Sequence, residues 1–332
     1  MDWGAILENT LRGFFGEQAI YYALAAIGLN IHFGYTGLLN FGQALFMAAG
    51  AYGLAITVVT YDGSFWLGIF MGVVVFPLIM AIILGFPTLR LRADYLAIVT
   101  IAAAEIFRLF VRSPRWDWLT GSSDGLGQYA TTFYDLSPFN PRTRYGIGPL
   151  NFLGNQMWVV LVGWALILIV VGIVYLLVNS PWGRVLKAIR EDEDAARSLG
   201  KNAYWFKMQS LMLGGVIGAM AGVLRAIGTQ SAQPDNFITD VTFLAWVALI
   251  LGGAGRVFGP VIGAMILWAV LTFTDTFLRQ VVDQKIVPES LMVGTQVGQV
   301  RYILIGLLLV SLAAFRPQGM FVNRDEMALD DR

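Results

Sequence analysis

The sequence predicts an all-α protein that crosses a membrane several times. Of its 332 residues, 57% are hydrophobic and only 13% are charged, about half the charged fraction of an average soluble domain. Several apolar runs reach the ~20 residues that a helix needs to cross the hydrocarbon of a bilayer. A transmembrane β-barrel would instead show short segments of alternating polar and apolar residues. We therefore predict one transmembrane domain, residues 1–332, with about 8–10 transmembrane or re-entrant helices.

Composition excludes several function classes. The net charge is zero, so the chain lacks the basic footprint of a nucleic-acid-binding protein. Cysteine is absent and His32 is the one histidine, which removes thiolate chemistry and leaves little for a metal site or a catalytic triad. No G-x-x-x-x-G-K-[ST] motif occurs, so no nucleotide or other cofactor is expected on this chain. Residues 1–16 lack the basic start and small-residue cleavage site of a signal peptide.

The apolar runs follow a regular order. Residues 1–16 are expected to form a short interfacial segment. Predicted spans lie at residues 18–33, 63–89, 95–111, 156–178, 208–228, 257–274 and 302–315. The apolar run 241–253 is only about half a bilayer long, at 1.5 Å per helical residue.

The charge-free stretch 34–61 opens with GYTGLLNFGQ, which indicates a broken or re-entrant start to its helix. Broken helices occur at membrane depth where the backbone is buried in protein or lines a cavity. Asn40 and Gln43 are therefore candidates for a solute path, together with Gly253 and Arg256 of the GGAGR turn in the second half. The alternative is that these amides hydrogen-bond neighbouring helices. Glycine-rich openings at 34–53 and 252–263 also suggest an internal two-fold repeat, although chance similarity would explain them equally well.

The polar segments predict the orientation. Residues 112–154 contain four prolines and a GSSDG turn, which is typical of an ordered external loop. Basic residues gather at 184–207, at Arg90 with Arg92, and at Arg316 with Arg324, and the positive-inside rule places all three groups in the cytoplasm. We thus predict a cytoplasmic loop at 181–207 and a cytoplasmic tail at 317–332.

The charged loop holds a pattern that suggests docking. Its Asp-Ala-Ala-x-x-x-Gly spacing is that of the loop by which ABC importer permeases contact their ATPases. Short side chains would enter a groove on the partner, and flanking charges would fix the register. The candidate coupling residues are Arg190, Glu193, Asp194, Ala195, Ala196, Arg197 and Gly200. The alternative is an ordinary solvated loop.

Two further groups have both structural and functional interpretations. Gly214, Gly218 and Gly222 recur every four residues and form a small-residue stripe, which we assign to helix packing, with a dimer or pore-facing seam as the alternative. Ionisable residues near membrane depth are functional candidates by default. They are His32, Glu105, Arg108, Arg225, Asp240 and Asp275, and structural pairing or snorkelling is the alternative for each.

The ordered set of these segments resembles the permeases of branched-chain amino acid ABC importers. GYTGLLNFGQALFMAAGAYGLA is similar to their first signature, and LRLRADYLAIVTIAAAEIFRLF followed by LTGSSDGL resembles the LivM-type subunit. LKAIREDEDAARSLGKN resembles their coupling loop, GGAGRVFGPVIGA follows, and FRPQGMF closes the set. Asp194 stands where the general importer motif has Glu, which keeps the acidic role.

The resemblance implies a multi-pass subunit of the bacterial inner membrane that is not itself an enzyme. It implies a heterodimer with a LivH-type sister permease, two ATPase subunits that carry ATP and Mg²⁺, and an external or periplasmic amino-acid-binding protein. Importers of urea, short amides or other neutral amino acids share the fold and remain alternatives for the solute. An ion-coupled secondary carrier and a structural membrane subunit are alternatives from other classes.

Overall fold

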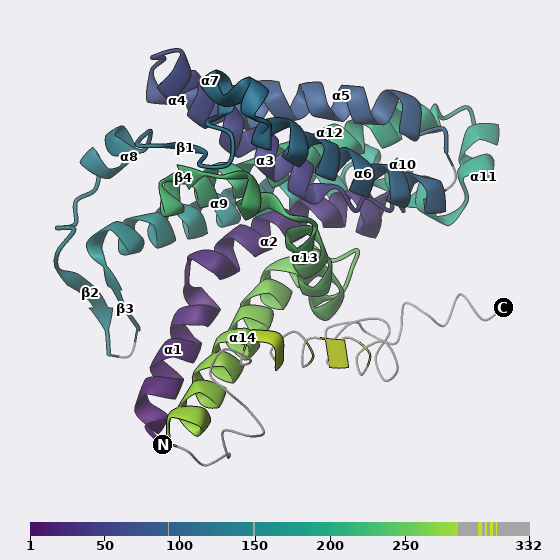
Figure 1. The fold of residues 1–332 in the computed structure, drawn as a ribbon. Coiled ribbons are helices and arrows are strands. Elements are labelled where there is room, and N and C mark those ends of the chain that lie inside the picture. Colours follow the sequence, from purple (N-terminus) through teal and green to yellow (C-terminus); the bar gives the residue numbers. More distant parts are fainter. Residues whose placement is uncertain are drawn as a thin grey trace.

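The structure is a computed structural model that describes residues 1–91, 93–148, 150–284 and 298–300, with positions 303, 306, 307 and 310. In these residues the chain forms a helical bundle (Figure 1). Six helical segments are long and apolar enough to cross a membrane: Gln43–Thr60, Phe65–Thr88, Gly154–Asn179, Ala203–Thr229, Pro234–Gly252 and Gly259–Asp283. The prediction of an all-α polytopic protein is therefore confirmed.

Some predicted features lie outside the described residues. They are the span at 302–315 apart from isolated positions, the tail 317–332, the closing FRPQGMF motif, and Arg92, Arg316 and Arg324.

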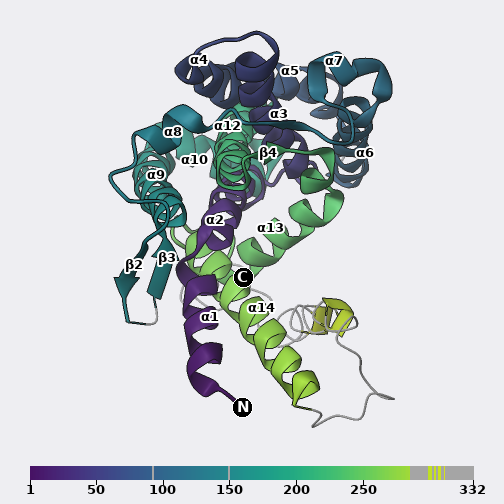
Figure 2. The same ribbon diagram turned by 60° about the vertical axis from the view of Figure 1, so that its left-hand side comes forward.

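The chain begins with two helices that meet at Gly16. Helix α1 (Trp3–Phe15) is capped by Asp2, whose side chain accepts from Ala5 N. It runs beside α14 (Gly259–Asp283) in both views (Figures 1 and 2). Helix α2 (Glu17–Leu29) continues into the π-helical turn η1 (Asn30–Tyr35), and nearly all of its side chains are buried. The interfacial segment predicted at 1–16 is thus a helix packed along α14.

The predicted break lies between η1 and α3 (Gln43–Ala55), which continues as η2 (Ile56–Thr60). The freed backbone groups find partners on two other helices. Phe41 N donates to Thr100 Oγ1 at 3.0 Å, Ala44 N donates to Thr242 Oγ1 at 2.9 Å, and the Asn40 carbonyl accepts from Trp246 Nε1 at 3.0 Å. Because its polar groups are paired within protein, the break avoids the cost of unpaired backbone in lipid.

A long helical hairpin follows. One arm comprises α4 (Phe65–Phe70), η3 (Met71–Val75) and α5 (Phe76–Thr88), and the other is α6 (Ala93–Arg112). Helix α6 carries charged residues along its length, which is why it falls outside the six most apolar segments even though a span was predicted there.

The loop predicted at 112–154 is ordered and holds short elements. They are η4 (Pro114–Trp116), α7 (Asp117–Thr120), β1 (Leu126–Gly127), α8 (Thr131–Asp135), β2 (Arg144–Ile147) and β3 (Leu150–Leu153). Strand β1 pairs antiparallel with β4 (Ser231–Ala232), and β2 pairs with β3. The Tyr129 and Tyr134 hydroxyls donate to the Ala226 and Ile227 carbonyls at 2.8 and 2.9 Å. These carbonyls lie in the last turn of α12, where helices lack internal partners, so the loop caps that helix.

The second half contains α9 (Gly154–Asn179), α10 (Pro181–Glu191), α11 (Glu193–Ser198) and α12 (Ala203–Thr229). The turn η5 (Pro234–Phe237), α13 (Thr239–Gly252) and α14 complete it. The run predicted to be half a bilayer long begins earlier than expected, because η5 extends it to Pro234–Gly252. Helices α10 and α11 lie at one end of the bundle, called the loop end below, and α4, α7 and α8 lie at the other (Figure 1).

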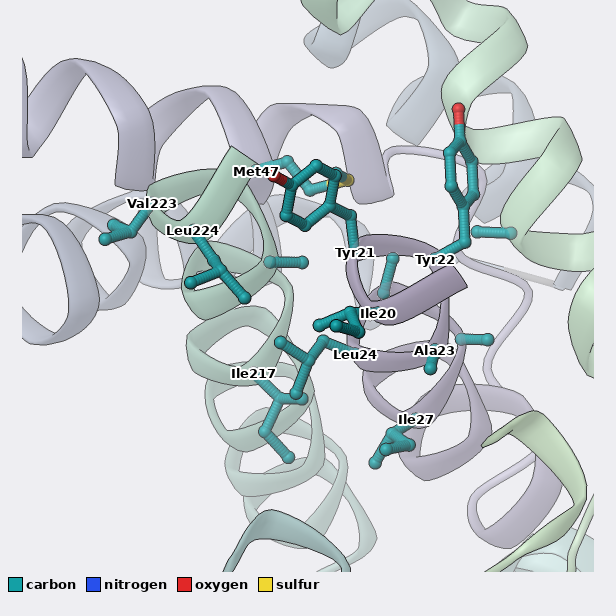
Figure 3. Packing of buried hydrophobic residues seen from close by; sticks show 14 of the residues in the cluster. Ile20, Tyr21, Tyr22, Ala23, Leu24, Ile27, Met47, Ile217, Val223 and Leu224 are labelled. Carbon is teal, nitrogen blue, oxygen red and sulfur yellow. The ribbon is translucent and has the colours of Figure 1, made fainter. Parts of the chain in front are cut away.

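The core forms where α12 packs against α2 and α3. Ile20 and Leu24 of α2 face Ile217 and Leu224 of α12, and Met47 of α3 lies beside them (Figure 3). All of these side chains are buried. This packing fixes α3 and its broken start relative to the helices that flank the charged loop.

Candidate functional site

The charged loop folds as two short helices with a sharp corner at Asp192. Asp192 is extended, and its side chain accepts from Ala195 N at 2.9 Å, so it caps α11. Helix α11 ends in a Schellman motif, because Lys201 N donates to the Ala196 carbonyl and Gly200 N to the Arg197 carbonyl. Gly200 has φ +77°, a conformation that costs other residues roughly 1–2 kcal/mol. The glycine of the predicted motif therefore ends the helix.

Two residues of the predicted coupling set hold α11 to the rest of the chain. Glu193 accepts from Arg197 at 2.6 Å and from Lys207 of α12. Ala196 is buried with Ile189 and Ala203. Ala196, which we expected among the short side chains that enter a partner's groove, instead directs its methyl group toward α10 and α12.

The outward face of α11 contains Asp194 and Ala195 of the predicted set, and Leu199, which follows the helix directly and was not in the set. The Asp194 carboxylate side chain is 92% exposed, with only a 3.6 Å ion pair to Arg197. Ala195 is exposed, and Leu199 is 80% exposed. An exposed leucine beside an exposed carboxylate, on a helix that is capped at both ends, gives this end of the chain a small amphipathic surface.

Arg190 connects the loop to the broken segment of the bundle. Its guanidinium donates from Nη1 to the Gly34 carbonyl at 2.6 Å, near the end of η1. It also pairs with Glu191 at 2.5 Å. A Cβ at Gly34 would lie 2.5 Å from Gly255 N, so only glycine permits the close approach of η1 and the GGAGR turn. The Arg190 hydrogen bond therefore links α10 directly to η1.

Asn30 joins η1 to the GGAGR turn. Its Nδ2 donates to the Arg256 carbonyl at 2.7 Å, and its Oδ1 accepts from Gly255 N at 2.8 Å. Asn30 is 1% exposed. The two glycine-rich segments that suggested an internal repeat thus lie against each other, and the repeat itself stays a prediction. Gly253 is buried where α13 ends, and Arg256 follows in the same turn.

Asn40 and Gln43 lie inside the helix bundle. Asn40 Nδ2 donates to His32 Nδ1 at 3.0 Å, and His32 Nε2 donates to the Leu211 carbonyl at 3.2 Å. Gln43 Nε2 donates to the Ala25 and Gly214 carbonyls at 3.3 and 3.4 Å. Both amides are essentially fully buried. Within one subunit they make the interhelical contacts of the alternative interpretation, and their part in a solute path stays a prediction.

The glycine stripe of α12 faces other helices of the same chain. A Cβ at Gly214 would lie 2.6 Å from His32 Cδ2, and one at Gly222 would lie 2.6 Å from Met47 Cα. A Cβ at Gly218 would lie 3.0 Å from Gln43 Cδ. The stripe allows α12 to approach α2 and α3 closely.

Glu105 and Arg108 form an ion pair at 2.5 Å near the end of α6, and Asp235 of η5 pairs with Arg108 at 3.2 Å and with Arg112 at 3.1 Å. This cluster lies far along α6 from the charged loop. It ties η5 to α6.

Several residues of the site were not in the predicted set. Asp192 stands directly before the helical run 193–198, and a cap at that position was readable from sequence. Lys207 pairs with Glu193, 14 residues earlier, and Asn30 binds the GGAGR turn, 226 residues later. No local sequence signal identifies partners at such separations.

Together, the spanning helices, the broken segment and the capped charged loop define a multi-pass permease. The family described as "Branched-chain amino acid transport system / permease component" matches residues 14–313, and the chain belongs to that family. Its members are transport subunits, so the protein is a permease and not an enzyme. Permeases of ABC transporters work with ATPase and other components.

Curated relatives match most of the chain. The LivM permease of a high-affinity branched-chain amino acid transport system from Salmonella typhimurium is 29% identical over 94% of this chain and 70% of its own length. A probable branched-chain amino acid permease LivM from Methanocaldococcus jannaschii is 26% identical, covering 91% of each chain. A nucleoside ABC transporter permease, NupC, from Lactococcus lactis is 24% identical over 86% of this chain and 88% of its own length.

Proposed function

We propose that this chain is the permease subunit of an ATP-driven importer for branched-chain amino acids in the bacterial inner membrane. Its partners would be a LivH-type sister permease, two ATPase subunits that hold ATP and Mg²⁺, and an external amino-acid-binding protein. The similarity to two LivM permeases over more than nine-tenths of the chain supports this solute class. The positive-inside rule places the loop end in the cytoplasm.

The outward face of α11 is the observation that carries the coupling role. Asp194, Ala195 and Leu199 project from a helix whose other side is fixed by Ala196 and by the Glu193 ion pairs. A partner that moves this face moves α11 and α10 as one unit, because Ala196 packs against Ile189 of α10.

The contacts of Arg190 and Asn30 give that movement a route into the bundle. ATP binding would close the ATPase pair and displace the loop. Arg190 would draw the Gly34 carbonyl with it, and Asn30 would carry the displacement to Gly255 and Arg256. The broken segment and the GGAGR turn would then shift together, which changes access to a path formed with the sister permease.

The coupling role is tested with Asp194→Lys in the assembled complex, purified through a tag on this chain and reconstituted in liposomes. We expect solute-stimulated ATP hydrolysis to fall at least about ten-fold, the effect of ~1.4 kcal/mol lost from docking. Asp135→Lys is the control, since Asp135 is an exposed acid at the end of α8. Stimulated hydrolysis that stays at the wild-type level in both variants would exclude α11 as the coupling element.

The solute class is tested separately, with the wild-type complex. Labelled leucine, a nucleoside and urea are offered as solutes with and without ATP. Uptake of leucine alone, and only with ATP, is the expected result. Uptake of the nucleoside or urea instead would change the solute but leave the permease class intact, whereas leucine uptake without ATP would favour a secondary carrier.

A further inference from the structure

The loop end contains a cavity of about 670 Å³ between α9, α10 and the GGAGR turn. Three cationic side chains line it: Lys187 and Arg190 from α10, and Arg256 from the turn. Arg190 is engaged by Glu191 and the Gly34 carbonyl. In the described part of the chain, the Lys187 ammonium and the Arg256 guanidinium have no hydrogen-bond or ion-pair partner. None of the described residues that line the cavity is acidic. Among the described residues, the charges of Lys187 and Arg256 therefore have no counterion.

The position of the cavity matches the boundary between membrane and water. It opens beside Tyr175 and Asn179 in the last turns of α9, and α9 has the highest hydropathy of the six candidate spans. Tyr175 is 53% exposed, and exposed tyrosines are typical of the interface where headgroups lie. The apolar Phe258 on the turn is 58% exposed and completes the rim.

An apolar strip leads from the cavity along α9 toward the centre of the membrane. Leu168, Gly172 and Leu176 are exposed at helical spacings of four residues. No atom of the described residues lies within 4 Å of a Cβ placed at Gly172, so none of them covers this face. A phosphate in the cavity would leave two acyl chains aligned with this strip.

We propose that this cavity binds the phosphate headgroup of an anionic phospholipid from the leaflet at the loop end. Basic pockets between transmembrane helices on the cytoplasmic side bind such headgroups, and each nearby cation adds to the affinity. Lys187 and Arg256 supply the free charges, Tyr175 and Phe258 enclose the glycerol region, and α9 supports the acyl chains. Because α10 and the turn each contribute a cation, the lipid bridges the charged loop to the GGAGR turn. Lipid binding at this cavity requires that the chain is embedded in a membrane, and it is independent of which solute the permease carries.

The test measures binding of dioleoyl phosphatidylglycerol and dioleoyl phosphatidylcholine to the full chain in detergent by native mass spectrometry. We expect retained adducts of phosphatidylglycerol only. Lys187→Gln and Arg256→Gln should each weaken that binding about five-fold. Lys201→Gln is the matched control, because Lys201 is an exposed lysine of the same loop that does not line the cavity.

Three results would overturn the proposal. Equal retention of both lipids would show that charge does not select the ligand. Equal weakening by Lys201→Gln would show only diffuse attraction to a basic surface. Displacement of phosphatidylglycerol by millimolar inorganic phosphate would identify a site for free anions instead.

The melting temperature of each variant, measured without lipid, is the folding control. If it matches that of the wild type, the lost binding does not come from misfolding.

Discussion

Asn30→Leu is the substitution that the structure makes most informative. Leucine has the same branched arrangement of heavy atoms as asparagine, although it is bulkier, and it cannot form the bonds to Gly255 N and the Arg256 carbonyl, which are 2.8 and 2.7 Å long. Because Asn30 is only 1% exposed, water cannot reach the site to replace the lost hydrogen bonds. An unpaired buried polar group costs about 1–3 kcal/mol, and two such groups in one turn give about 2–4 kcal/mol of lost stability, since the losses overlap.

This substitution is measured in two ways, with Asn155→Leu as the control. Asn155 lies in the first turn of α9, and its Oδ1 has no hydrogen-bond partner in the structure, so the same chemical change removes no such bond there. We expect the melting temperature of purified Asn30→Leu to fall by roughly 5 °C or more relative to the control.

In the reconstituted complex, ATP hydrolysis should continue while solute uptake per ATP falls, because Asn30 lies between η1 and the GGAGR turn and not in the loop 181–207 that we propose as the ATPase contact. If Asn30→Leu and Asn155→Leu had equal melting temperatures and the ratio of uptake to hydrolysis were unchanged, Asn30 would not be the link between η1 and the GGAGR turn that we infer.

Two further predictions concern the packing of α12 and α3. Gly222→Ala should lower stability by about 1–3 kcal/mol, because its Cβ would meet the Met47 backbone, which cannot rotate away. Gly172→Ala is the control, because the space at its Cβ is open, and it should be neutral or gain up to ~1 kcal/mol of stability from helix propensity. Equal melting temperatures of the Gly222→Ala and Gly172→Ala variants would contradict the packing argument. Gln43→Leu should lower the melting temperature through the lost contacts to Ala25 and Gly214, at a cost of about 1 kcal/mol. A wild-type melting temperature with slowed uptake would instead support its role in the solute path.

The amino-acid sequence alone determined the class of this protein and the position of most helices. Hydropathy follows from local composition, so apolar runs of bilayer length are visible without knowledge of the fold. The break between η1 and α3 was also predictable, because three separate glycines, Asn40 and Gln43 interrupt a charge-free stretch. The spacing of Asp194, Ala195 and Gly200 predicts a docking loop, and that role stays a prediction, whereas Gly200 does end α11 with a positive φ.

Tertiary structure decided which side of each element carries its function. Within the coupling set, the sequence could not separate Ala196, which is buried, from Ala195, which is exposed. The difference depends on how α11 rests on α10 and α12. The hydrogen-bond partners of Asn30, Asn40 and Gln43 also depend on which distant segments pack together. The sequence does not reveal those partners, because an amide side chain reads the same whether it faces water or a neighbouring carbonyl.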